Sequence, residues 1–312
     1  MSAPWVVIAG PTGTGKSELA VAIAERLDCE IVNYDSVQIY RGFDIGSAKP
    51  DAGLRARVPH HLYDTADPRA EWNAAEFAEL AERACAGIES RGRRPLLVGG
   101  TGFWLRALLA GLPEMPPRDE TVRRRLSRLL GTPRGAARAH RWLTRVDPAA
   151  AAKIAPADRH RIERALEVWM LTRKPISART APGPRSPRRP SIVFAIRFPR
   201  DLLIDRLDAR VEAMYAAGLV EETGRLLARY GPDARPFGSI GYAEAAAVVA
   251  GAKELSDAIE ETKRRTRAYA KRQMTWLRAE QDVHWLDAPR ALESLVEEAL
   301  AIVRYESPRE NE

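Results

Sequence analysis

The chain has 312 residues, of which 45% are hydrophobic, so it is long enough to form one large domain and a smaller one. Its 49 basic residues exceed its 42 acidic residues, and the resulting charge of +7 favours a polyanionic partner. Two cysteines are too few for a disulfide scaffold or a cysteine zinc site, and no apolar run approaches the roughly 18 residues of a membrane helix, so we expect a cytoplasmic protein with no membrane partner.

The first predicted element is a strand, Trp5–Ala9, that runs into a glycine-rich segment and then into an amphipathic helix. The segment consists of Gly10, Pro11, Thr12, Gly13, Thr14, Gly15, Lys16 and Ser17. Strand, glycine loop and helix in this order are typical of a phosphate-binding loop, or P-loop, of the kind that binds ATP and other nucleotides. Backbone N–H groups and the helix N-terminus can hold phosphate oxygens, Lys16 adds a charge, and the Ser17 hydroxyl suits Mg²⁺. We therefore expect a bound diphosphate or triphosphate, with Mg²⁺ as cofactor.

Four more short apolar runs alternate with helical patterns. They predict strands at Glu30–Asn33, Pro95–Gly99, Ile192–Arg197 and Val283–Leu286. This alternation is typical of an α/β fold, here a P-loop core with a doubly wound parallel sheet covered by helices on both faces. The interval between Pro95–Gly99 and Ile192–Arg197 is too long for one crossover helix. We therefore expect a discontinuous core, residues 1–116 and 192–312, and a helical insertion over residues 117–191.

The expected insertion is bounded by proline-rich stretches, Pro113–Pro117 and Pro182–Pro190. Within it, Arg161–Thr172 reads as a helix with Ile162, Leu166 and Trp169 on one stripe. Residues 118–191 contain 19 basic and 6 acidic side chains, so the basic character of the chain is concentrated there. A second basic segment, Asp257–Arg278, reads as one long helix near the end of the chain.

Two features near strand ends carry the candidate chemistry. In P-loop hydrolases a later strand normally ends in an acidic residue, but here the strand at residues 96–98 runs into Gly99, Gly100 and Thr101. The nearest strand-end carboxylate is Asp35, and because parallel strands end at one edge of the sheet we expect it near Lys16. Arg210 follows the fourth predicted strand, where nucleotide kinases carry phosphate-clamping arginines. The residues alone do not favour it over Arg206.

Several other residues are better explained by structure than by function. A structural role is several times more frequent than a metal site for an adjacent pair such as His60 and His61 without a second cluster. We interpret Trp142, Trp169 and Trp276 as core residues rather than base-stacking platforms, and Cys85 as buried packing.

Five segments together resemble the bacterial tRNA dimethylallyltransferases, also called tRNA isopentenyltransferases. They are the P-loop, Asp-Ser-Val-Gln-Ile-Tyr-Arg-Gly at 35–42, Asp-Ile-Gly-Ser-Ala-Lys-Pro at 44–50, Gly-Gly-Thr-Gly at 99–102 with Leu-Arg-Ala-Leu at 105–108, and Lys-Arg-Gln-Met-Thr-Trp-Leu-Arg at 271–278. The resemblance runs from about residue 6 to residue 287 and is most specific in the second and last of these segments.

The resemblance implies transfer of a dimethylallyl group from dimethylallyl diphosphate to the exocyclic N6 of the adenosine just 3′ of the tRNA anticodon, with release of diphosphate. Thr12 would then contact the bridging oxygen, Arg210 the diphosphate, and Asp35 would accept the proton from the attacking amine. Such a carboxylate fits the chemistry, because an exocyclic adenine amine is a poor nucleophile.

The resemblance also implies a set of tRNA contacts. Asp35, Ser36, Val37 and Gln38 would grip the flipped base, with Thr101 and Arg123 at its channel. Further tRNA contacts fall on the insertion and on the basic helix: Arg159, His160, Arg161, Ile162 and Glu163, and Lys271, Arg272, Gln273 and Arg278. The chain departs from the family at residues 155–158, which read Ala-Pro-Ala-Asp where the family commonly has His-Pro-Asn-Asp.

Three alternatives stay open. A related enzyme that prenylates free adenine nucleotides would share the chemistry but would not need the insertion. A small-molecule kinase would use the same loop, yet it explains neither the basic insertion nor the basic helix. An RNA-binding, nucleotide-gated switch without prenyl chemistry would explain the basic charge but would give Asp35 and Thr101 no function. The sequence leaves the length of the isoprenoid donor and the set of modified tRNAs open, and we expect a monomer.

Overall fold

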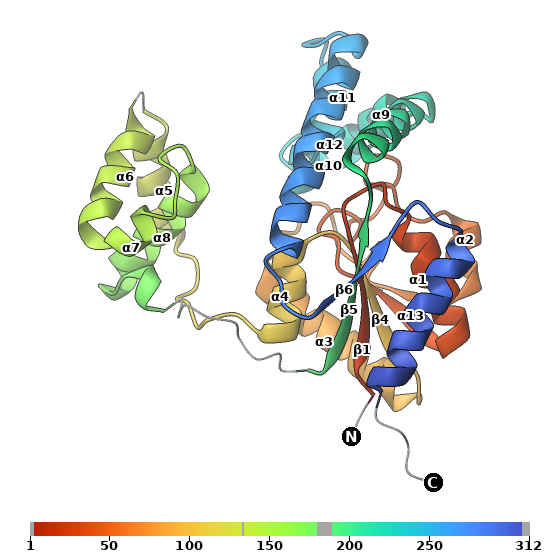
Figure 1. The fold of residues 1–312 in the computed structure, drawn as a ribbon. Helices are drawn as coiled ribbons and strands as arrows, with labels where there is room; N and C mark the ends of the chain where they lie inside the picture. Colours follow the sequence, from red (N-terminus) through yellow and green to blue (C-terminus); the bar gives the residue numbers. More distant parts are fainter. Residues whose placement is uncertain (1–2, 133, 180–188, 308–312) are drawn as a thin grey trace. The chain divides into compact units, whose positions relative to one another are not determined.

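The computed structural model describes residues 3–132, 134–179 and 189–307. Within these ranges, six strands form one parallel sheet in the order β3-β2-β4-β1-β5-β6 (Figure 1). The strands are β1 (Trp5–Ala9), β2 (Cys29–Asn33), β3 (His60–His61), β4 (Arg94–Val98), β5 (Ser191–Arg197) and β6 (Val283–Asp287). The expected α/β architecture with a doubly wound parallel sheet is confirmed.

The central strand, β1, is buried along its whole length between β4 and β5. Its apolar run suits a parallel strand that is covered on both faces. Each of the five predicted strands is present, with ends shifted by no more than one residue. The shifts include one correction, because Ser191, expected in the insertion, is the first residue of β5 and pairs with Trp5. The short edge strand β3 was not predicted, since two histidines carry no apolar pattern.

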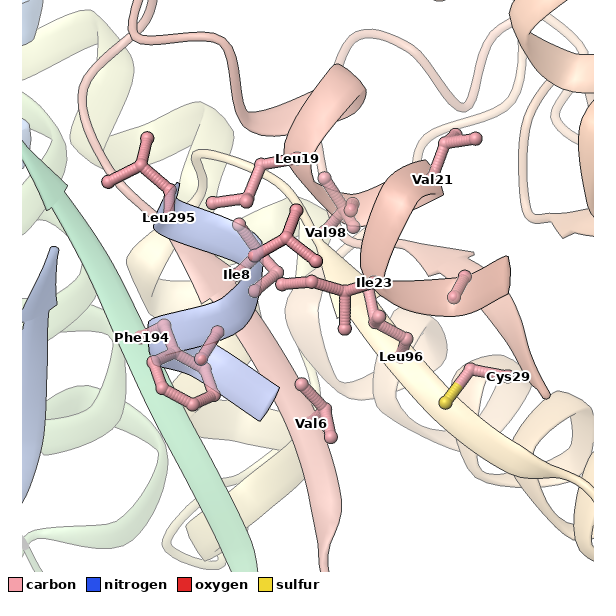
Figure 2. Close-up of a cluster of buried hydrophobic side chains, with 14 of the residues drawn as sticks. Val6, Ile8, Leu19, Val21, Ile23, Cys29, Leu96, Val98, Phe194 and Leu295 are labelled. Carbon is pink, nitrogen blue, oxygen red and sulfur yellow. The ribbon is translucent and has the colours of Figure 1, made fainter. Parts of the chain in front are cut away.

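Helices cover both faces of the sheet. On one face, Leu19 and Ile23 of α1 (Lys16–Leu27) and Leu295 of α13 (Leu292–Glu306) pack on Val6 and Ile8 of β1 (Figure 2). On the other face, α12 (Leu255–Leu277) packs near its end against β1 and β5. It also contacts α4 (Gly102–Ala110), which packs on α3 (Ala74–Ser90). This two-sided cover leaves the carboxyl ends of the strands as the edge where loops gather.

Four of the remaining helices of the core form a group with α12. These are α9 (Arg200–Ala216), α10 (Leu219–Tyr230), the 3-10 helix η2 (Arg235–Gly238) and α11 (Tyr242–Val249). The short helix α2 (Ala52–Arg57) instead contacts α1. The long helix α12 packs on α9 and α11, so it connects this group to the sheet. No described helix is long and apolar enough to cross a membrane.

A second compact unit, residues 112–186, separates from the unit formed by residues 1–111 and 187–312. Its elements are α5 (Glu120–Leu130), α6 (Gly135–Val146), α7 (Pro148–Ala151), α8 (Arg159–Thr172) and η1 (Ile176–Ala178). It has a core of its own, to which Leu126, Leu143, Ile162 and Leu166 contribute. The predicted proline-rich border Pro182–Pro190 lies outside the described residues, except for its last two positions.

Candidate active site

The P-loop connects β1 to α1 and has a backbone that only glycine adopts freely. Gly13 and Gly15 have φ angles of +80° and +83°, in the left-handed region. A Cβ atom at Gly13 would also lie 2.8 Å from Cδ2 of Leu207 on α9. Thr14 Oγ1 donates to the carbonyl oxygen of Pro11 at 2.9 Å and closes the turn. Its glycines, the Thr14 side chain and the close packing of Leu207 therefore shape the loop.

Lys16, at the start of α1, folds back over this loop. Its Nζ donates to the carbonyl oxygen of Pro11 at 2.8 Å. Burial, and after it the neighbouring Arg210 guanidinium, lower the pKa of Lys16 to about 8, although Asp35 and Glu18 act in the opposite direction. A bound anion would stabilise the charged form, so the loop is suited to a diphosphate.

Arg206 and Arg210, both on α9, reach the P-loop. Arg210 Nη1 donates to Thr12 Oγ1 at 3.3 Å, whereas Arg206 Nε donates to the carbonyl oxygen of Gly13 at 3.1 Å. Burial lowers the pKa of Arg210, against the raising influence of Glu18 and Asp35. Arg206 is exposed and engages backbone, so Arg210 is the arginine with its charge inside the site.

Asp35 follows β2 and organises a tight turn. Its Oδ1 accepts hydrogen bonds from the backbone N–H groups of Val37 and Gln38, at 2.9 and 3.3 Å. Its own N–H donates to Asn33 Oδ1 at 2.9 Å. Asp35 raises the pKa of both Lys16 and Arg210, so it lies within electrostatic reach of the P-loop.

Thr101 connects the ends of β2 and β4. Its Oγ1 accepts a hydrogen bond from the Ser36 N–H at 3.0 Å and donates to Ser36 Oγ at 3.2 Å. These contacts bring together two of the segments that carry the resemblance, although they lie about 65 positions apart in the chain.

Gln273 has a different place from the one expected. Its side chain is only 2% exposed, Oε1 accepts from the Thr12 N–H at 2.8 Å, and Nε2 donates to the Gly100 carbonyl oxygen at 2.9 Å. Both ends of the amide are therefore used inside the protein, so its predicted tRNA contact is not one that the side chain is free to make. Tyr269, one helical turn earlier, donates to Gly100 at 3.2 Å and was missed. Tyr269 lies four positions before Gln273 and therefore on the same face of the helix, and this spacing could have predicted its place in the site.

The other predicted tRNA contacts on α12 and at its C-terminal end are exposed. Lys271, Arg272 and Arg278 all lie at the surface, and Arg272 stacks over the Tyr269 ring with 5.7 Å to its centroid. Their charges are accessible to a polyanion.

The structural interpretations of the histidines and of Cys85 agree with the structure. His61 Nε2 lies 2.6 Å from Glu30 Oε2, and His60 Nδ1 lies 2.8 Å from the Val58 carbonyl oxygen. Cys85 is buried. In the described ranges, no group of three or more His, Cys, Asp or Glu residues could hold a metal ion.

In the second unit, Arg123 is held by acidic residues of α8. Its Nε lies 3.4 Å from Glu167 Oε1, a fully buried side chain, and its Nη2 lies 3.7 Å from Glu163 Oε2. Glu163 also accepts from Ser127 Oγ at 2.7 Å. These contacts give Arg123 and Glu163 a structural role inside the unit.

The start of α8 divides into exposed and buried residues. Arg159, His160 and Arg161 are exposed, whereas Ile162 is fully buried in the core of the unit. The predicted tRNA contact of Ile162 is therefore corrected to a packing role, because its side chain has no surface to offer.

The chain is similar to proteins of one family. A family model described as IPP transferase matches residues 38–280, and one described as Isopentenyl transferase matches residues 5–56. The tRNA dimethylallyltransferase of Geobacter sulfurreducens is 46% identical over 296 residues, which cover 93% of this chain and 94% of that protein. The tRNA dimethylallyltransferase of Anaeromyxobacter dehalogenans is 47% identical over 290 residues, which cover 93% and 97%.

Two solved structures are similar along nearly the whole chain. The full-length tRNA isopentenylpyrophosphate transferase of Bacillus halodurans gives a TM-score of 0.71 at 35% identity and covers 97% of each chain. A eukaryotic dimethylallyltransferase acting on tRNA gives a TM-score of 0.81 at 27% identity, and the match covers 100% of this chain and 82% of that one.

Proposed function

The chain belongs to the IPP transferase family, and we propose that it transfers a dimethylallyl group from dimethylallyl diphosphate to N6 of the adenosine 3′-adjacent to the tRNA anticodon, releasing diphosphate. The observation that carries the proposal is the electrostatic grouping of Lys16, Arg210 and Asp35 at one edge of the sheet. Two cations suit a leaving diphosphate, and the carboxylate suits a proton acceptor.

The leaving group gains negative charge as the bond between the allyl carbon and the bridging oxygen breaks. Donors that are already in place stabilise such charge without reorganising at the moment of reaction. The P-loop backbone, Lys16 and Arg210 would supply them, and Thr12 Oγ1, which accepts from Arg210, would contact the bridging oxygen.

The attacking amine loses a proton as the new C–N bond forms. Asp35 is the proposed acceptor, since its Oδ1 is used by the turn while Oδ2 lies on the side of Gly100, 3.6 Å from where a Cβ atom there would be. A carboxylate in this position would accept the proton that the amine loses.

Mg²⁺ is the proposed cofactor, and the hydroxyl of Ser17, in the first turn of α1, is an oxygen donor of the kind that it binds. Mg²⁺ is commonly bound by one or two protein oxygens together with phosphate oxygens and water. Ser17 would be the protein ligand. When bound, the ion would neutralise charge on the diphosphate.

The target adenosine is stacked in the anticodon arm, so it must leave the stack to reach Asp35. Asp35, Ser36, Val37, Gln38 and Thr101 are the proposed contacts of the flipped base, and Arg123, which Glu163 and Glu167 hold within the insertion, is proposed to contact the tRNA from there. Basic residues of the insertion and of α12, including Arg159, His160 and Arg161 with Lys271, Arg272 and Arg278, would bind the tRNA backbone. Localisation in the cytoplasm and a monomeric state are part of the same proposal.

The test is incubation of the protein with dimethylallyl diphosphate, Mg²⁺ and unmodified tRNA, followed by mass analysis of the nucleosides. We expect an adenosine that has gained one dimethylallyl group. ATP turnover without tRNA and without any prenylated nucleoside would instead support the small-molecule kinase.

A further inference from the structure

A short turn over residues 43–49 holds the side chain of Gln38. Its Nε2 donates to the carbonyl oxygens of Ser47 and Ala48, at 2.9 and 3.1 Å. The amide cannot flip without losing both contacts, so Oε1 is the atom left to accept a hydrogen bond from a ligand. The turn therefore decides which end of the Gln38 amide is presented.

This turn is held in place by two helices from much later in the chain. The Ile45 N–H donates to both carboxylate oxygens of Glu222 on α10, at 3.1 Å each. The Gly46 N–H donates to the hydroxyl of Tyr242 on α11 at 3.1 Å, and Tyr242 donates to Glu222 Oε1 at 2.6 Å. Glu222 is 5% exposed and Tyr242 is fully buried, so water does not compete for these bonds.

The packing around the turn leaves little freedom. A Cβ atom at Gly46 would lie 2.6 Å from Cε2 of the Tyr242 ring, so only glycine permits this approach. The Phe43 ring meets the Tyr242 ring edge-on, with centroids 4.8 Å apart. Burial and the neighbouring Glu222 raise the pKa of Tyr242, which keeps the phenol protonated and able to donate.

We propose that Glu222 and Tyr242 are positioning residues for recognition of the base: they hold the 43–49 turn and, through it, the amide of Gln38. The inference rests on the proposed function, in which Gln38 grips the flipped adenine. Neither residue touches substrate in this account. The P-loop has other supports, Pro11 for Lys16 and Gln273 for Thr12, so binding of dimethylallyl diphosphate should not depend on the pair.

The test compares Tyr242→Phe with a matched control, Tyr215→Phe. Tyr215 on α9 is also buried and bonds through its hydroxyl, 2.9 Å from Thr262 Oγ1, but it does not hold the turn. Tyr242→Phe removes the hydroxyl and keeps the ring. We expect the KM for tRNA to rise roughly fivefold to tenfold while the KM for dimethylallyl diphosphate changes by less than about twofold. The control should lose similar thermal stability and leave the KM for tRNA unchanged.

A second variant, Glu222→Gln, keeps an acceptor for Ile45 and Tyr242 and should raise the KM for tRNA less than Tyr242→Phe does. The decisive step is a double-mutant cycle with Gln38→Ala, because Tyr242→Phe should add nothing further to the KM for tRNA once the Gln38 amide is gone. Additive effects, or an equal rise in both KM values, would overturn the inference while leaving the proposed function intact. An inactive wild-type chain would contradict the proposed function itself.

Discussion

The backbone N–H of Thr12 donates to Oε1 of Gln273 at 2.8 Å, across 261 positions of the chain. The other end of the same amide holds the Gly100 carbonyl oxygen. Gln273 therefore joins the loop after β1 to the loop after β4, and α12 holds two parts of the site in register.

Replacement of Gln273 by Met should damage both stability and catalysis. The Thr12 N–H would lose its partner, which costs about 1–3 kcal/mol for a buried unsatisfied group. The Gly100 carbonyl oxygen would lose one of its two donors and keep the Tyr269 hydroxyl. Denaturant unfolding and steady-state turnover would measure the two effects. Arg272→Met, at the exposed neighbouring position, is the control and should leave stability close to wild type. Equal stability of the two variants would contradict the bridging role.

Asp35→Asn should abolish most turnover without dismantling the turn. The asparagine keeps an Oδ1 that can accept from Val37 and Gln38, but it cannot take a proton from the amine. We expect turnover to fall by ~10²-fold or more with tRNA affinity largely kept. Asp35→Ala, which also loses the turn contacts, should weaken tRNA binding as well. Near-native turnover of Asp35→Asn in single-turnover assays would place the base elsewhere.

The lowered pKa of Lys16, about 8 instead of 10.5, predicts two opposite pH effects. Between these values the folded chain has released a proton that the unfolded chain keeps, so the contribution of Lys16 to stability increases as pH rises from about 8 to about 10.5. Diphosphate binding requires the charged ammonium, so affinity for dimethylallyl diphosphate should fall as pH rises through about 8. Titration calorimetry from about pH 7 to about pH 9.5 would measure the affinity of wild type and of Lys16→Met for dimethylallyl diphosphate. The variant should bind more weakly, and its affinity should not fall as pH rises through about 8. If the affinity for dimethylallyl diphosphate depended on pH in the same way in wild type and in Lys16→Met, Lys16 would not be the titrating group.

Reversal of insertion charges should weaken tRNA binding specifically. Arg124 and Arg128 on α5 are exposed, whereas Arg123 is held by Glu163 and Glu167, so its reversal would damage the fold of the unit. Arg124→Glu with Arg128→Glu should lower tRNA affinity and flatten its dependence on salt, with little change for dimethylallyl diphosphate.

A charge-matched control separates this effect from net charge. Arg83 and Arg304 are exposed arginines of the core unit, and their double reversal removes the same charge. If the salt curves of the insertion variant and the control coincide, the insertion has no special part in binding tRNA, and prenylation of free nucleotides gains support.

Much of the fold was predictable because a parallel sheet needs apolar strands. The run at Trp5–Ala9 and those of the other core strands consist mainly of apolar residues, as a strand buried on both faces requires. The edge strand β3 has no such apolar composition. Its two residues, His60 and His61, are a strand only because they pair with Ile31 and Val32 of β2, and this pairing leaves no pattern in the sequence. The burial of Ile162 follows from the helical stripe that predicts it as core, and assigning it to tRNA as well gave one side chain two incompatible roles.

The site was less predictable, because its contacts join distant segments. A P-loop motif predicts the positions of Gly13 and Lys16 locally, but nothing local distinguishes Arg210 from Arg206, which lies one helical turn away. The inward amide of Gln273 depends on how α12 crosses the sheet, and a basic segment around it favoured a surface role. Sequence patterns report charge well, but they do not show which member of a basic helix is buried.

The most direct test of the account offers the protein three acceptors with the same dimethylallyl diphosphate and Mg²⁺: unmodified tRNA, the same tRNA with guanosine in place of the adenosine after the anticodon, and free adenosine monophosphate. Nucleoside mass analysis after site-specific digestion would follow the prenyl group, and release of diphosphate would be measured beside ATP turnover. We predict prenylated adenosine only with the first acceptor, at that one position, with diphosphate release in step and little ATP hydrolysis. Equal prenylation of free adenosine monophosphate, or transfer to the guanosine-substituted tRNA, would contradict the account.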